Sequence, residues 1–151
     1  MRLINAGVVQ ELTGLTADQL REWTTRRDLI KPDLEPNGPG SRARYAWQTV
    51  LLLRLAVALR QTFHVELQAQ RSLFIALANR LAKAPFPALQ GTALVVRGSG
   101  TFDIVPLEEI QIVDADVLII RLDPHLDVLS VGFGLNEPMR QLPLFPAVAV
   151  R

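Results

Sequence analysis

The sequence contains no cysteine and only two histidines, His64 and His125. The absence of cysteine excludes disulfide bonds, thiolate metal sites, haem attachment through cysteine and a cysteine nucleophile. Two histidines that are distant in the chain make a poor ligand set, so we expect neither a metal nor another cofactor. We assign both histidines to surface or helix-capping positions.

A long apolar run is also missing. The most apolar windows, residues 50–59 and 117–122, fall well short of the roughly 18 apolar residues that a membrane-spanning helix needs. The N-terminal residues lack the pattern of a secretory signal. We therefore expect a cytoplasmic protein without a membrane partner. The 151 residues are 49% hydrophobic, which can bury the core of one domain or of a small head with an appendage.

Charge is unevenly distributed, although the formal net charge is only +1. Residues 1–84 contain twelve Lys or Arg against seven Asp or Glu, a net of +5, whereas residues 85–151 contain four against eight, a net of −4. A basic half can follow a polyanion through phosphate contacts, whereas an acidic half is repelled by it and serves another purpose.

Two short helices joined by a glycine turn are predicted near the N-terminus. Apolar residues at helical spacing predict a first helix over residues 5–12, and Gly14 favours a left-handed stop after it. Thr16 and Gln19 form a capping-box pattern that starts a second helix, ending near Arg27. Such a pair makes a helix-turn-helix, whose second helix can enter the major groove of DNA.

An arm and two longer helices are predicted for the rest of the basic half. Three prolines and two glycines within residues 30–45 exclude regular helix and predict an extended arm with a turn at its tip. Residues 47–62 carry apolar side chains on more than one face, typical of a buried helix, and residues 66–83 carry one apolar stripe. Trp23 and Trp47 lie on or beside apolar helical stripes, so we interpret both as core anchors.

Strands dominate the prediction for the acidic half. Four β-rich runs occur, at residues 92–97, 101–105, 117–122 and 128–133. A Gly-Ser-Gly sequence between the first two signals a hairpin. We predict a short helical turn within residues 106–112, a turn-like connector over residues 123–127, and an extended tail from Pro138 that packs across a neighbour. The overall prediction is an α+β protein with a helical head over residues 1–84 and a small β-rich module over residues 85–151.

An ordered set of short motifs runs through residues 3–59. The set consists of the run VVQELTGLTADQLREWTTRRDLIKP, an arm containing GSRARY, and a helix beginning WQTVLLLRL. In this order the motifs resemble the winged helix-turn-helix head of the MerR family of bacterial transcription regulators. The chain departs from that family in having Ala46 where a capping serine is common. The β-rich half also replaces the long C-terminal helix that dimerises the family.

The resemblance implies a DNA site on the second helix, whose front faces the groove and whose Arg21 reaches the backbone or a base. Trp23 would brace that helix. In the arm it implies contacts from Arg42, Arg44 and Tyr45 with phosphates or the minor groove, and either arginine fits the family's wing position. We assign the basic residues that flank the second helix to phosphate contacts rather than to a solvated surface. The predicted DNA-binding residues are Thr16, Ala17, Gln19, Arg21, Arg26, Arg27, Lys31, Arg42, Arg44 and Tyr45.

These features predict a DNA-binding transcription regulator, not an enzyme, that acts as a homodimer on a pseudo-palindromic site in double-stranded DNA. The acidic half would hold the dimer, receive a ligand, or contact RNA polymerase or another protein. An alternative function is a phage or mobile-element adaptor or architectural protein whose C-terminal module binds a protein partner.

A third possible function is a metal-dependent nuclease that uses Asp114 and Asp116. The same alternation of aspartate with apolar residues is also typical of a solvated sheet edge, and we prefer that interpretation.

Overall fold

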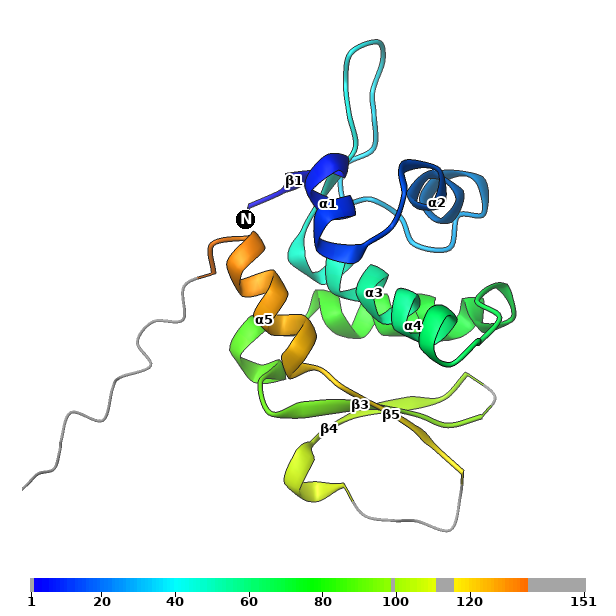
Figure 1. The fold of residues 1–151 in the computed structure, drawn as a ribbon, viewed down its shortest axis with the longest axis vertical. Coiled ribbons are helices and arrows are strands. Elements are labelled where there is room, and N and C mark those ends of the chain that lie inside the picture. The colour runs from blue at the N-terminus through cyan, green and yellow to red at the C-terminus, as the bar shows by residue number, and fades with distance from the viewer. Residues whose placement is uncertain (1, 99, 111–115, 136–151) are drawn as a thin grey trace, which may run out of the picture.

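The computed structural model describes residues 2–98, 100–110 and 116–135 (Figure 1). Helices dominate the first half of the chain, and a small sheet and one further helix follow, which confirms the predicted α+β class. The predicted tail from Pro138 and the residue Asp114 lie outside the described residues.

The first helix, α1 (Ala6–Thr13), begins and ends where its sequence signals lie. The Asn5 side chain accepts a hydrogen bond from the amide of Val8, which satisfies one free donor of the first turn. Gly14 adopts a φ of 78°, and its amide donates to the carbonyl of Gln10. This left-handed residue turns the chain into α2 (Ala17–Arg21), which continues as a π-helical turn over Glu22–Arg26.

The predicted arm projects from the helices at the top of Figure 1. A bridge between Leu34 and Arg44 closes its base, and Gly38 and Gly40 have positive φ at its tip. Strand β2 (Arg44–Tyr45) returns the arm to the body by pairing antiparallel with β1 (Ile4–Asn5).

The two longer helices predicted for the head are both present. Most side chains of α3 (Trp47–Val57) are buried, and the helix continues as a π-helical turn over Ala58–Thr62. A short 3₁₀ turn leads into α4 (Arg71–Ala82), which buries one stripe of side chains. That stripe consists of Leu73, Phe74, Leu77 and Leu81.

A three-stranded antiparallel sheet with the order β4-β3-β5 forms the second half, together with α5. Its strands are β3 (Thr92–Val96), β4 (Phe102–Pro106) and β5 (Leu118–Arg121), and a 3₁₀ turn over Leu107–Glu109 follows β4. Leu94 in the central strand pairs with Ile104 on one side and Ile120 on the other, so the three share a face. These elements confirm the predicted hairpin, the third strand and the short helical turn.

The prediction of a connector and a fourth strand over residues 123–133 is wrong, because this segment forms α5 (Asp123–Gly132). Leu122, Leu126, Leu129 and Phe133 recur at helical spacing and are all buried. Pro124 is compatible with a helix because it lies in the first turn, where its missing N–H costs no hydrogen bond. Packing of this stripe outweighs the β-propensity of the valines between its members.

One hydrophobic core unites the two halves of the described chain. Leu51 of α3, Phe74 of α4, Leu94 of β3 and Leu126 of α5 all belong to the same buried cluster. Helix α5 contacts α1 and α3, while α4 contacts α3 (Figure 1). The change in charge sign near Pro85 therefore does not coincide with a break in the core.

Candidate nucleic-acid interface

A complete capping box fixes the start of α2. The Thr16 hydroxyl accepts a hydrogen bond from the amide of Gln19 at 3.1 Å, and Gln19 Oε1 accepts one from the amide of Thr16 at 3.0 Å. Both residues and Ala17 are exposed. Both capping contacts use only side-chain oxygens as acceptors. The Thr16 hydroxyl and the side-chain amide of Gln19 can therefore still donate hydrogen bonds to a ligand. The front of this helix is therefore both rigid and accessible.

The opposite side of the same helix is anchored in the core. Leu20 and Trp23 are buried, and the Thr24 hydroxyl donates to the carbonyl of Leu20 at 2.8 Å. Trp47 is buried too, with its ring edge-to-face against Phe86 at 5.1 Å between centroids. The prediction that both tryptophans are core anchors is confirmed.

Tyr45 was predicted to approach phosphates, and the structure corrects this. Its side chain is only 2% exposed and packs in the core beneath the arm. Burial raises the pKa of the Tyr45 hydroxyl, and a hydrogen bond with Thr24 opposes this shift. Tyr45 thus braces the helix through Thr24 and offers nothing to a phosphate.

The predicted basic residues along and after the second helix are all exposed. Three of them form weak ion pairs: Arg21 with Asp18 at 3.2 Å, Arg27 with Glu22 at 3.8 Å, and Lys31 with Asp28 at 3.7 Å. Exposed pairs of this kind contribute at most about 1 kcal/mol, so a phosphate can replace the carboxylate at little cost. Arg26 has no ion pair within the described part of the chain.

Arg42 and Arg44 are exposed on the returning side of the arm, and neither has a carboxylate partner among residues 2–98, 100–110 and 116–135. The Arg44 backbone is nevertheless fixed, because its amide donates to the Leu34 carbonyl at 2.9 Å and its carbonyl accepts from Asp33 at 3.0 Å. The arm therefore presents two free guanidinium groups near an ordered base.

Asp33 holds the arm to α3 and was missed in the sequence. Its Oδ2 accepts a hydrogen bond from the amide of Ala46 at 2.7 Å, across 13 residues. Ala46 precedes α3 and has no side chain able to cap it. A carboxylate from the start of the arm satisfies this terminus, and no local capping pattern signals it because the two residues are not neighbours in sequence.

Arg71 ties the end of the same helical segment to α4 and was also missed. Its Nη1 donates to the carbonyl of Arg27 at 2.9 Å, and its Nη2 lies 3.6 Å from Oδ2 of Asp28. Asp28 has a φ of 49°, in the left-handed region where the helical segment ends. The contact spans 44 residues, so only the fold brings these groups together.

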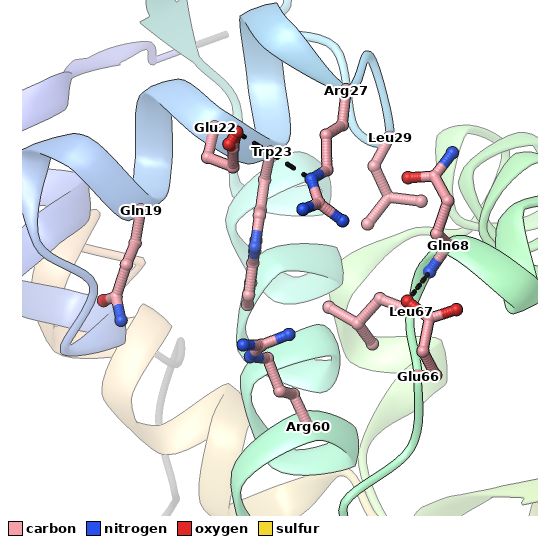
Figure 2. A pocket seen from close by; sticks show the side chains of 9 residues that line it. All are labelled: Gln19, Glu22, Trp23, Arg27, Leu29, Arg60, Glu66, Leu67 and Gln68. Atoms are coloured by element: carbon pink, nitrogen blue, oxygen red, sulfur yellow. Dashed lines mark hydrogen bonds and ion pairs between the residues drawn. The ribbon is translucent and has the colours of Figure 1, made fainter.

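A small pocket of about 140 Å³ opens between this helical segment and residues 60–68, which follow α3 (Figure 2). The Arg27 and Arg60 guanidinium groups lie beside the Trp23 ring there, with Gln19 and Gln68 at the rim. Arg60, from the π-helical turn after α3, was absent from the predicted site, and Glu22 and Glu66 line the same pocket, so its two arginines face two carboxylates.

The two histidines differ in environment. His64 is exposed, in agreement with the predicted surface position, and its φ is 54°. His125 was predicted to lie at the surface or in a cap, but it is half-buried on α5 and contacts Arg54.

Two of the described aspartates in the acidic half have structural partners. Asp103 pairs with Arg97, and Asp123 accepts a hydrogen bond from the amide of Gly91 at 2.8 Å. Asp116 is exposed. Within the described ranges, no three His, Asp or Glu side chains lie close enough together to hold a metal ion.

Across the described residues, no helix has the length and apolar character needed to cross a membrane. Comparison with models of known protein families finds no match for this chain, and comparison with curated protein sequences finds no relative.

Proposed function

We propose that this chain is a sequence-specific DNA-binding transcription regulator with a winged helix-turn-helix head similar to that of the MerR family. One observation carries the proposal: α2 has a buried back and an accessible, capped front, and the projecting arm, whose strand β2 contacts α1 as α2 does, carries two arginines without ion pairs among the described residues. A helix of this kind suits the major groove, and the arm suits the adjacent backbone.

In this proposal the front of α2 reads the bases, and the basic residues around it bind phosphates. Arg21 lies one turn into the helix and reaches a base edge or the backbone once it leaves Asp18. Arg42, Arg44 and Arg26 begin without ion-pair partners in the described chain, so phosphate binding costs them no existing pair.

The proposed binding unit is a homodimer on a pseudo-palindromic site in double-stranded DNA. One head covers too few base pairs for strong specificity, so two heads on half-sites about one helical turn or a multiple apart are required. Because its acidic residues repel phosphates, the acidic half is assigned to dimer formation or to contact with RNA polymerase or another protein. Ile119 is 41% exposed on the sheet face opposite Leu94, which leaves apolar surface available for such contacts.

The test is enrichment of bound fragments from sheared bacterial genomic DNA at near-physiological salt, with the solution mass of the protein measured in parallel. We expect one enriched pseudo-palindrome and a dimeric mass. The double variant Arg42→Ala/Arg44→Ala should lose binding, whereas Arg121→Ala, an exposed arginine on the sheet, should retain it. Salt-sensitive binding without enrichment would instead indicate the adaptor, and no binding by the native chain would refute the proposal.

A further inference from the structure

A second hollow lies where the arm meets the helices, and none of the predicted DNA-binding residues lines it. It has a volume of about 310 Å³, at the lower end of the roughly 300–1,000 Å³ typical of small-molecule sites. It is lined by Asp33, Gln48, Thr49, Leu52, Ala78, Asn79 and Ala82. These residues come from the base of the arm, the first half of α3 and the end of α4. We call it the arm-base groove.

The charge and polarity of the arm-base groove favour a positively charged ligand. Asp33 is its only charged lining residue, and that carboxylate has no ion pair among the described residues. The Asp33 oxygen Oδ2 accepts from the Ala46 amide, which leaves the other oxygen available. No lysine or arginine lines the groove, so an anion finds no counter-charge there.

An unsatisfied acceptor points to the same chemistry. The Gln48 Oε1 atom is buried and has no hydrogen-bond partner within the described chain. Buried polar atoms are nearly always paired, and this oxygen meets a donor in the groove once the Gln48 amide rotates toward it. Gln48, Thr49 and Asn79 all carry oxygens able to accept from an N–H group.

The rest of the lining favours an organic ion over a bare metal ion. Leu52, Ala78 and Ala82 give the groove an apolar wall, which a hydrated metal cannot use. Divalent cations are best bound by several charged oxygen ligands, and this groove offers one carboxylate beside three neutral side chains. Such a lining suits a short alkyl stem on the alanines and a cationic head at Asp33.

We propose that the arm-base groove binds a small organic cation, an alkylguanidinium or alkylammonium group on a short apolar stem. The cationic head pairs with Asp33, and a rotation of the Gln48 amide brings its carbonyl to a further N–H of the ligand. Because Asp33 also holds the Ala46 amide, the ligand rests on the residue that links the arm to α3. Binding at this site does not depend on the proposed DNA function.

The test is a titration of the full ¹⁵N-labelled chain with butylguanidinium chloride, at constant ionic strength, followed by NMR. N-butylurea serves as the neutral control because it has nearly the same shape without the charge. We expect saturable shifts centred on the amides of Thr49 and Asn79 and on the Gln48 side chain. Butylurea should bind at least about tenfold more weakly, as expected when a charge-assisted hydrogen bond is lost.

Three variants complete the experiment. Asp33→Asn retains an acceptor for Ala46 and should weaken butylguanidinium binding by at least about tenfold. Ala82→Leu fills the groove from an exposed position and should block binding even if Asp33→Asn does not fold. Asp127→Asn, the same change at an exposed site on α5, should bind like the native chain.

Equal binding of butylurea and butylguanidinium, native affinity in folded Asp33→Asn, native affinity in Ala82→Leu, or shifts confined to other surfaces would each overturn the proposal. All of these readouts are obtained without DNA, so failure of the regulator function leaves them interpretable.

Discussion

Arg54 of α3 donates a hydrogen bond from Nε to Nδ1 of His125 on α5 at 3.1 Å, although 71 residues separate them. The same guanidinium donates to the Leu12 carbonyl near the end of α1. Arg54 has no carboxylate partner within the described chain, and burial lowers its pKa. A single cation therefore joins the N-terminal helix, the central helix and the last helix, and it requires an unprotonated ring nitrogen on His125 to do so.

This contact predicts that stability falls in mildly acidic solution. Burial, and then the charge of Arg54, lower the pKa of His125 from 6.5 to about 4. Between these values the unfolded chain binds a proton that the folded chain excludes, so the free energy of unfolding decreases as the pH falls from about 6.5 to about 4. Urea unfolding at several pH values should show this loss.

The variant His125→Gln isolates the contribution of His125 to this pH dependence of stability. Glutamine keeps an acceptor for Arg54 but binds no proton, so the variant should lose less stability than the native chain between pH 6.5 and 4. His64→Gln alters an exposed histidine away from Arg54 and should follow the native curve. Identical curves for His125→Gln and the native chain would rule out the assigned role.

The sequence predicted those features whose causes are local. The capping box of Thr16 and Gln19 involves residues three apart, and the turn at Gly14 depends on one backbone conformation, so both are visible in a short window. The head helices were predicted from their apolar spacing, and β3, β4 and β5 from β-rich runs of the chain.

The features that were missed depend on contacts between distant residues. The valines of residues 128–133 favour β-structure and predict a strand after a connector, whereas packing of α5 against α1 and α3 decides the outcome. Similarly, nothing near Asp33 or Arg71 in the sequence indicates that they hold the arm and the end of the second helix. Tyr45 was placed in the DNA site by resemblance, which gives position along the chain but not side-chain direction.

Gly14→Ala should destabilise the fold through backbone strain alone. A Cβ added at Gly14 meets no atom within 4 Å, so the substitution causes no clash. The φ of 78° remains unfavourable for alanine, which predicts a loss of roughly 1–2 kcal/mol in chemical denaturation. Gly98→Ala provides the control, because that site is also open but lacks a positive φ. A loss of equal size in both variants would show that the left-handed turn is not the cause.

Arg71→Ala should loosen the end of the second helix. It removes the hydrogen bond to the Arg27 carbonyl and one of the two cationic partners of Asp28, which predicts a decrease of roughly 1 kcal/mol in the free energy of unfolding. If the proposed DNA site is correct, specific binding also weakens while its salt dependence stays unchanged, because Arg71 positions the helix. Arg80→Ala, an exposed arginine on the same α4, should change neither quantity. A salt slope reduced by about one would instead identify Arg71 as a phosphate contact.

Arg21→Ala and Arg44→Ala should separate base reading from phosphate binding within the proposed site. Arg21 lies on the accessible front of α2, so its loss should reduce affinity for the enriched site more than affinity for random DNA. Arg44 lies on the arm, and its loss should weaken binding to every sequence and reduce the salt slope by about one.

Both arginines are exposed, so neither change should disturb the core, and circular dichroism can verify this. Fluorescence anisotropy with specific and scrambled duplexes at several salt concentrations measures both effects. Equal losses on the two duplexes for Arg21→Ala would remove it from the bases and place it on the backbone with Arg44. The specificity of the head would then rest on the other residues predicted to face the groove, Thr16, Ala17 and Gln19, which are exposed at the start of α2.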